Sequence, residues 1–374
     1  MSRFRPVAAR IDLGAVAANV ATLSDVAGGA ALMAVVKADA YGHGAVEVAR
    51  AALGAGATWL GVALVEEGAA LRDAGLDGPV LLLSEPPVSA AAAVVDAGLT
   101  PVVYREVWVD ALAKAVADAG RSTPLSVHLK VDTGMHRAGC DPADAVTLAR
   151  SVAARDELLL EGLMTHLAVA DEPDHSATAI QLACFDEVRT GLAEAGIEPA
   201  VVHAANSAAT LTRPETRFDL VRCGIALYGI PPAPALAGHA SLRPVLRLQA
   251  EVAQVRRVAA GEGVSYGLRY RLERDATIAV VPVGYGDGVP RRLGEVGGEV
   301  LIGGARYPIS GTVTMDQLMV DCGDSDVAVG DEVVLIGSQG DEEITATEWA
   351  QRLGTIAYEI TCGVGARVPR VYVS

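Results

Sequence analysis

Residues 34–44 read AVVKADAYGHG, and this stretch places an amine at the end of a buried strand. Ala34, Val35 and Val36 are typical of the close of a short apolar strand, and Lys37 follows directly. The carboxyl ends of the strands are where an α/β barrel carries its active site. A lysine whose stem lies in an apolar wall can lose its proton near neutral pH and attack an aldehyde. A lysine that simply extends into water is the more ordinary alternative, so the rest of the chain must decide.

Short apolar runs alternate with alanine-rich segments of helical period up to about residue 237. The runs, taken as strands, are 32–36, 59–64, 80–84, 100–104, 125–132, 158–167, 200–207 and 220–229. Strands that alternate with helices indicate a parallel sheet, and eight such units in this length predict a (β/α)8 barrel of the TIM type over residues 11–237. An open doubly wound sheet is the alternative, but no G-x-G-x-x-G motif follows an early strand.

The sequence changes character after the proline-rich stretch 229–238. Helical period gives way to short apolar runs separated by glycine turns, as at 276–286 and 298–313. One helix is expected after Thr345, which forms a capping box with Glu348. We therefore predict a second, mostly antiparallel β-domain over residues 238–374, completed by an N-terminal strand at residues 1–10.

Composition excludes several classes of function. The net charge is 30 minus 46, or −16, which argues against nucleic acid or an anionic membrane as partner. Hydrophobic residues make up 51%, but no uninterrupted apolar run is long enough to span a membrane, and no secretory signal begins the chain. The five cysteines form no C-x-x-C pair, and the seven histidines lack zinc-ligand spacing. These features predict a cytoplasmic protein with reduced thiols and no metal.

Polar side chains gather at the ends of the later predicted strands. In a barrel these ends meet at one mouth, so we expect the groups to converge. Backbone amides that follow the eighth strand can bind an anion even in an acidic protein. The candidates are Lys130, Arg137, His166, Asn206, Ser207, Arg222 and the amides of Gly224 and Ile225.

Each of these residues also has an ordinary structural interpretation. Arg222 could form a surface ion pair, and His166 could be a hydrogen-bonded core histidine. Asn206 and Ser207 could only cap a helix. Convergence of the whole set is a stronger argument for a site than any one of its members.

At this point the chain resembles the alanine racemases, a family of pyridoxal-phosphate enzymes of fold type III. The likeness covers nearly the whole length and rests on motifs in the right order. They are AVVKADAYGHG, KVDTGMHRAG, THLAVADE, ANSAAT, VRCGIALYG, VSYGLRY, VPVGYGDGVPR, GTVTMDQ and YEITCGVGARVPR. The resemblance implies an N-terminal barrel, a C-terminal β-domain and a homodimer with shared active sites.

The resemblance also implies residue roles. Lys37 holds pyridoxal 5'-phosphate as a Schiff base and is one catalytic base, and Tyr266 of the partner subunit is the opposing base. Arg222 faces the pyridine nitrogen, and His166 links it to Tyr266. Arg137 contacts the phenolic oxygen of the cofactor and the substrate, and Lys130 is a lysine that can be carbamylated and then braces Arg137. The substrate side is formed by Tyr285, Met315 and Asp316. The phosphate end of the cofactor is held by Tyr41, Asn206, Ser207, Gly224, Ile225 and Tyr358.

The implied activity is interconversion of L-alanine and D-alanine, which supplies D-alanine for peptidoglycan. Two departures from the family pattern are His136, where glycine is usual, and Thr314, where cysteine is common. A broader racemase acting on serine or basic amino acids, an eliminating or aldol-cleaving enzyme of the same cofactor fold, and a non-catalytic cofactor-binding protein remain as alternatives.

Overall fold

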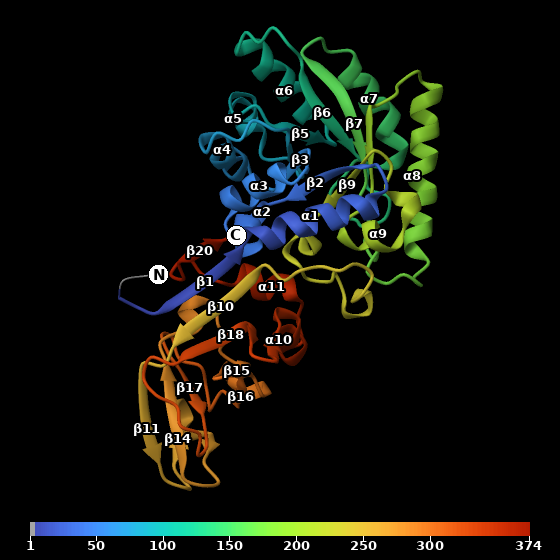
Figure 1. The fold of residues 1–374 in the computed structure, drawn as a ribbon. Helices are drawn as coiled ribbons and strands as arrows, with labels where there is room; N and C mark the ends of the chain where they lie inside the picture. The colour runs from blue at the N-terminus through green and yellow to red at the C-terminus, as the bar shows by residue number, and fades with distance from the viewer. Residues whose placement is uncertain (1–3) are drawn as a thin grey trace. The chain divides into compact units, whose positions relative to one another are not determined.

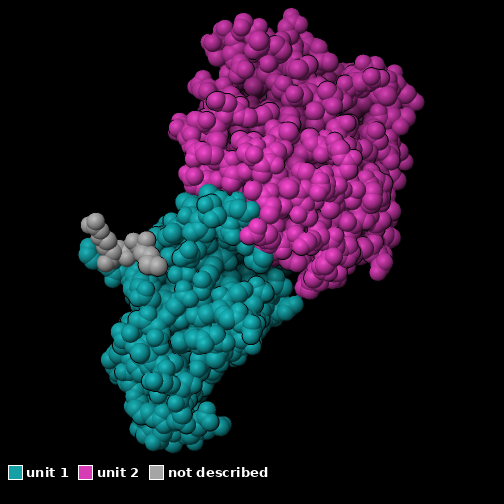
Figure 2. All heavy atoms as spheres, viewed as in Figure 1, with its two compact units in different colours: residues 1–15, 41–44, 244–374 teal, residues 16–40, 45–243 magenta. Residues whose placement is uncertain are grey.

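The computed structural model describes residues 4–374, and the chain forms two compact units (Figure 2). The barrel unit comprises residues 16–40 and 45–243, and the β-unit comprises residues 1–15, 41–44 and 244–374. The first three residues of the predicted N-terminal strand lie outside the described residues. The β-unit thus takes in the short segment 41–44, which follows Lys37 in the chain.

The barrel unit is built on eight parallel strands (Figure 1). Their order is β8-β7-β6-β5-β4-β3-β2-β9, and backbone bonds from Asp219 N to Val202 O and from Arg222 N to Ala205 O, both 3.0 Å, join β9 to the β8 side. The predicted barrel is therefore confirmed as a nearly closed one. The strands are β2 (Ala31–Val35), β3 (Trp59–Val62), β4 (Val80–Leu82), β5 (Thr100–Val103), β6 (Leu125–Lys130), β7 (Leu158–Met164), β8 (Val201–His203) and β9 (Leu220–Cys223).

Helices alternate with these strands and bury apolar stripes against them. In α6 the buried positions include Trp108, Leu112 and Val116, which recur every four residues on one helix face. Gly196 has φ +71° just after α8, as expected for a helix stop. The helices of this part of the chain are α1 (Leu13–Ala27), α3 (Ala45–Gly54), α4 (Val65–Asp73), α5 (Ala91–Asp96), α6 (Glu106–Asp118), α7 (Ala145–Ala153), α8 (Ala177–Glu194) and α9 (Ser207–Thr212).

The β-unit is mostly antiparallel. Its largest sheet has the order β16-β15-β18-β10-β1-β20 with β19 paired to β18, and a second sheet has the order β11-β14-β17. The strands are β1 (Val7–Asp12), β10 (Leu246–Glu251), β11 (Gln254–Val258), β12 (Gly263–Val264), β13 (Tyr270–Arg271), β14 (Ala276–Val281), β15 (Glu299–Ile302), β16 (Ala305–Pro308), β17 (Leu318–Asp321), β18 (Glu332–Gln339), β19 (Glu342–Ile344) and β20 (Arg370–Val373). β1 pairs antiparallel with β10 and parallel with β20.

The prediction of a single helix in this domain was wrong. Thr345 does cap α10 (Ala346–Leu353) by accepting a bond from Glu348 N, and Gly354 ends it in the left-handed region. A second helix, α11 (Ala357–Cys362), follows directly. Its six residues include β-branched Ile360 and Thr361, so the sequence is too short and too poor in strong helix formers to indicate it.

Candidate active site

Lys37 opens a left-handed turn just beyond β2. The residues 38–41 have φ between +52° and +55°, although none of them is glycine. Each such residue costs roughly 1–2 kcal/mol, and strain of this kind is characteristic of functional sites. The turn (α2, Lys37–Gly42) is held by bonds from Ala38 N to the Glu67 carboxylate at 2.6 Å and from Ala45 N to that of Asp39 at 2.8 Å.

Four cations act on one another in the barrel unit, even though the chain as a whole is acidic. Lys130 is 4% exposed, and its Nζ donates to Leu83 O at 2.8 Å. Burial, and then repulsion by Arg222, Arg137 and Lys37, lowers the pKa of Lys130 to about 8. The predicted lysine and arginine candidates are therefore brought together, and they create a strongly positive environment at the strand ends.

Arg222 is the most constrained of these cations. It is 4% exposed, and it donates to Thr165 O and Ala204 O, both at 2.9 Å. Its other partners are Nδ1 of His166 and Nδ1 of His203, each at 3.1 Å. Burial lowers the pKa of Arg222 to about 10, so the guanidinium still carries its charge at neutral pH.

His166 is neutral in this environment. Burial, followed by Arg222 and the other three cations, lowers the pKa of His166 well below its usual value. Its Nδ1 must accept from the guanidinium, which cannot accept, so the His166 proton lies on Nε2. Gln181 of α8 positions the segment: its amide donates to His166 O at 3.0 Å and accepts from Ala168 N at 2.9 Å.

Arg137 lies on an exposed loop that one carboxylate organises. Asp132 Oδ1 accepts from the amides of Gly134, Met135 and His136 at 2.9 to 3.0 Å. Burial alone raises the pKa of Asp132, but these three donors outweigh it and lower the pKa. His136 has φ +55°, which explains why glycine is the more usual residue at this position.

The segment predicted to bind an anion lies at the start of α9 and just after β9. Ser207 begins α9 and is buried, and its Oγ accepts from Gly224 N at 2.9 Å. Asn206 caps the same helix through Ala209 N at 3.0 Å, so its capping interpretation is also correct. Ile225 opens a 3-10 turn, and its amide therefore has no acceptor within that turn.

In the β-unit, Tyr41 and Tyr358 lie against each other. Their ring centroids are 5.9 Å apart, with the planes tilted by 48°. Burial, then Tyr358 and Cys362, raises the pKa of Tyr41, so its phenol stays protonated and can donate a hydrogen bond. Tyr358 lies on α11, the helix that the sequence did not predict.

The other predicted β-unit residues are exposed. Tyr266 is 72% exposed, and Met315 and Tyr285 are 52% and 41% exposed. Tyr285 N bonds Thr314 O at 2.9 Å, which places Tyr285 beside the Met315 segment. Asp316 accepts from Arg367 at 2.7 Å. Large apolar groups exposed in this way are typical of surfaces that meet another chain.

Several residues around Arg222 were not predicted from the sequence. His128 and His203 lie inside β6 and β8, Thr165 follows β7, and Gln181 is on α8. The only available signal was a histidine at an inward position of an apolar strand, a pattern that ordinary core histidines share.

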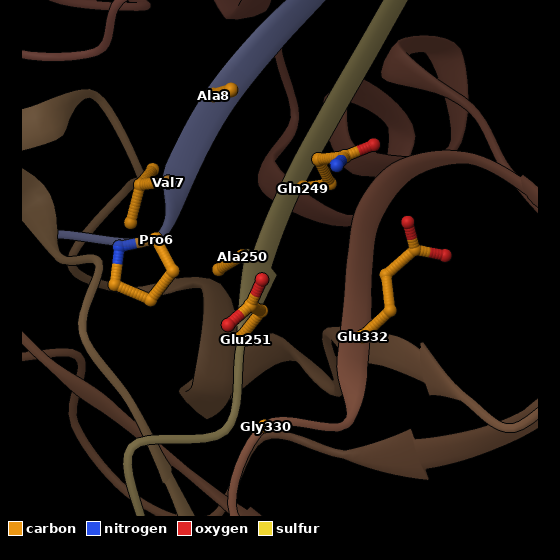
Figure 3. Close-up of a pocket in the computed structure, with 8 residues that line it drawn as sticks. All are labelled: Pro6, Val7, Ala8, Gln249, Ala250, Glu251, Gly330 and Glu332. Atoms are coloured by element: carbon orange, nitrogen blue, oxygen red, sulfur yellow. The ribbon is translucent and has the colours of Figure 1, made fainter. Parts of the chain in front are cut away.

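Other places in the described residues offer less chemistry. A hollow beside β1 and β10 is lined by Pro6, Val7, Ala8, Gln249, Ala250, Glu251, Gly330 and Glu332 (Figure 3). Its lining provides carboxylates and an amide but no cation. Within residues 4–374 no group of three or more His, Cys, Asp or Glu side chains could hold a metal ion, and no helix is long and apolar enough to cross a membrane.

Comparison with known proteins decides the family. The pattern of the alanine racemase N-terminal domain matches residues 11–232, and that of the C-terminal domain matches residues 245–372. The chain belongs to the alanine racemase family. It is 49% identical to the alanine racemase of Symbiobacterium thermophilum, over 98% of this chain and 97% of that protein.

Solved structures agree with this membership of the alanine racemase family. The alanine racemase of Streptomyces lavendulae superposes with a TM-score of 0.94 at 44% identity, covering 99% of this chain and 97% of that one. A histidine racemase from Leuconostoc mesenteroides gives 0.91 at 30% identity, covering 100% and 99%. The predicted resemblance is confirmed, and the second structure indicates that one fold can carry racemases named for different substrates.

Proposed function

We propose that this protein interconverts L-alanine and D-alanine with pyridoxal 5'-phosphate bound at Lys37. The observation that carries the proposal is the cluster of Lys37, Lys130, Arg137 and Arg222 at the barrel strand ends. In a chain of net charge −16, such a cluster fits a strongly anionic ligand.

The residues present fit this cofactor. The Ser207 hydroxyl and the Ile225 amide would donate hydrogen bonds to a phosphate, and Gly224, whose amide donates to Ser207 Oγ, would hold that hydroxyl in place. Tyr41 and Tyr358 each have a phenol that would donate to the same group. Arg222 has donors for a ring nitrogen, and Arg137 has donors for a phenolic oxygen. The bound cofactor would supply an electron sink for the charge left when the α-proton is removed.

Two bases are needed because each enantiomer presents its α-proton to one side only. Lys37 would hold the cofactor and, once released from it, take or return the proton on one face. Tyr266 of the partner subunit would do the same on the other face. A phenol that takes up and gives back a proton needs a neighbouring hydrogen-bond donor. The Nε2 proton of His166, which Arg222 fixes, would be that donor.

Arg222 would face the ring nitrogen of the bound cofactor. A guanidinium cannot hand over its proton as a carboxylic acid would, so Arg222 would donate a hydrogen bond there without protonating the ring. Such a partner would disfavour side reactions such as transamination. Tyr285, Met315 and Asp316 of the partner subunit would bound the substrate side, and Asn206 would keep α9 and Ser207 in position.

A racemase of broader specificity is the second candidate, favoured by the structural likeness to a histidine racemase. The higher identity to proteins named alanine racemase, 49% for one of them, supports alanine over that alternative. The five cysteines, which form no disulfide in the described residues, support the cytoplasmic location in which D-alanine would feed peptidoglycan synthesis.

Exchange of the α-proton tests the proposal. The purified protein, incubated with each alanine enantiomer in deuterium oxide, should lose the α-proton signal and yield the opposite enantiomer. The protein should be yellow. Borohydride should bleach it and leave the reduced cofactor covalently attached to Lys37. A colourless protein that ignores added pyridoxal phosphate contradicts the proposal. Faster exchange with serine, lysine or histidine than with alanine favours the second candidate.

A further inference from the structure

A series of side chains in contact with one another runs from Arg222 through His203 and His128 to Glu161. The guanidinium has only donors, so His203 Nδ1, 3.1 Å from the Arg222 NH1 nitrogen, must accept. The proton of neutral His203 therefore lies on Nε2. Burial, with a further contribution from Arg222, lowers the pKa of His203 well below its usual value, which keeps this ring neutral.

The same logic extends through the next ring. His203 Nε2 lies 2.8 Å from His128 Nδ1, so His128 must accept there and carry its own proton on Nε2. That nitrogen lies 3.5 Å from the Glu161 carboxylate, close enough for the negative charge to attract its proton, although the two groups make no hydrogen bond. Arg222, which can only donate, thus fixes the direction of the two hydrogen bonds, and the charge of Glu161 favours the same direction.

The backbone is shaped to make this chain possible. The parallel ladder of β6 and β7, neighbours in Figure 1, pairs Val127 with Leu160 but His128 with Gly162. Glu161 is therefore the extra residue of a β-bulge, a feature that redirects a side chain. A Cβ at Gly162 would lie 2.4 Å from the His128 ring, so only glycine leaves room for that ring.

The two ends of this series of side chains carry opposite charges, Arg222 at one end and Glu161 at the other. His128 contacts the Trp59 ring, with centroids 5.2 Å apart, and burial lowers its pKa. The nearby His128 ring, together with Ser126, lowers the pKa of Glu161, and Glu161 is partly exposed. The charged groups that act on the two rings are thus Glu161 at one end and Arg222 and Lys130 at the other.

We propose that Glu161 is a positioning residue that acts on Arg222 through His128 and His203. Aligned hydrogen bonds polarise one another, so the carboxylate makes His203 Nδ1 a stronger acceptor and holds the guanidinium in one orientation. The contacts from Glu161 to Arg222 do not depend on the proposed function. Only the role of Arg222 in cofactor binding and racemisation rests on it.

Nitrogen NMR of the full chain with labelled histidine tests the chain of bonds without any reaction. We expect His128 and His203 both to carry the proton on Nε2 at pH 7.5. Glu161→Ala should shift the Nε2 proton signal of His203, one ring beyond the lost contact, whereas Glu157→Ala, at the entry to the same strand, should not. A His203 proton on Nδ1, or a His203 signal indifferent to Glu161→Ala, overturns the proposal.

Cofactor affinity and kcat then show whether the orientation of Arg222 matters for binding and for the reaction. Glu161→Ala should weaken pyridoxal phosphate binding and lower kcat by about tenfold, the lower end of the range for lost orienting partners. Glu161→Gln, which keeps an acceptor but not the charge, should recover part of both. A stability loss with unchanged cofactor affinity and kcat overturns the positioning role. Normal NMR behaviour in a protein that does not racemise alanine would reject the proposed function alone.

Discussion

Arg222 shows how a single side chain organises a barrel interior. A buried guanidinium is tolerated only when acceptors surround it, and two of its acceptors are histidine nitrogens. Because the arginine can only donate, it fixes the tautomers of His166 and His203 on either side. One always-charged residue thus sets the proton positions of its neighbours.

The buried histidines predict an acid-sensitive fold. The pKa values of His128, His166 and His203 are all lowered, so in the folded state these rings bind protons only below the range in which unfolded histidines do. The free energy of unfolding should therefore not depend on these rings above about pH 6.5. Below that pH it should fall by up to about 1.4 kcal/mol per pH unit for each ring. Urea unfolding between pH 5 and 7.5 measures this slope.

Exposed histidines provide the control for that measurement. His136 and His175 are exposed, so His136→Asn and His175→Asn should leave the slope unchanged. A slope that follows the exposed histidines would contradict the assignment to the buried rings.

We predict that the Lys130 amine forms a carbamate with carbon dioxide. With its pKa lowered to about 8, a substantial fraction of the amine is neutral at slightly alkaline pH and can attack carbon dioxide. The product is an anion among Arg222, Arg137 and Lys37, so repulsion becomes attraction. Crystals grown with bicarbonate should show carboxylate density on Lys130, and carbon NMR with labelled bicarbonate should give a carbamate signal that Lys130→Met lacks. An unmodified amine in both measurements would contradict this prediction.

At this scale the sequence identified some of the charged groups of the site and missed the residues that hold them. Lys37 and His166 follow apolar runs and Arg222 interrupts one, so all three were visible as candidates. His203 and Glu161 are single polar residues in otherwise apolar strands, and His128 alternates with apolar residues, patterns that ordinary core or half-exposed residues share. The bulge that turns Glu161 towards His128 depends on pairing with another strand, which no local pattern contains.

The left-handed turn after β2 is the most unusual element. Ala-Asp-Ala-Tyr has no glycine, and its composition would favour an ordinary right-handed turn. Only the fold holds φ positive there, through the contacts of Ala38 and Asp39. Local sequence could therefore predict that chemistry follows β2 but not the conformation that presents it.

The turn predicts an unusual response to glycine. Ala38 is exposed with φ +52°, where glycine has no steric penalty. Ala38→Gly should raise the free energy of unfolding by up to about 1 kcal/mol, because the relief of strain exceeds the added freedom of the unfolded chain. Ala183→Gly, an exposed site within the right-handed helix α8, should lower it by about 1 kcal/mol. Equal losses in chemical denaturation would show that the turn is not strained.

At the scale of the whole molecule, the proposed site draws on two subunits. Lys37 belongs to the barrel unit, while Tyr266 is exposed in the β-unit, and the shared site remains a prediction. The sequence indicated a second domain from its change of period, and the family likeness supplied the dimer. Neither composition nor periodicity could predict the dimer, because in a sequence an interface side chain cannot be distinguished from any other exposed side chain.

Hybrid dimers test the shared site. Lys37→Ala and Tyr266→Phe should each be inactive alone, since each removes one base from every site. After subunit exchange, random pairing gives half hybrids with one intact site each, so about a quarter of the wild-type activity should return. Racemisation assays on mixtures measure this recovery, with mass spectrometry of differently labelled subunits to prove exchange. No recovery despite proven exchange would place both bases in one subunit.

The pairing of β1 has a consequence for how the protein is made. Residues 7–12 are synthesised long before their two neighbours in the sheet, residues 246–251 and 370–373. At typical synthesis rates this strand waits on the order of tens of seconds with both edges open, while the barrel can already fold. A nascent chain that stalls before β20 therefore keeps one edge of β1 exposed and is prone to aggregate.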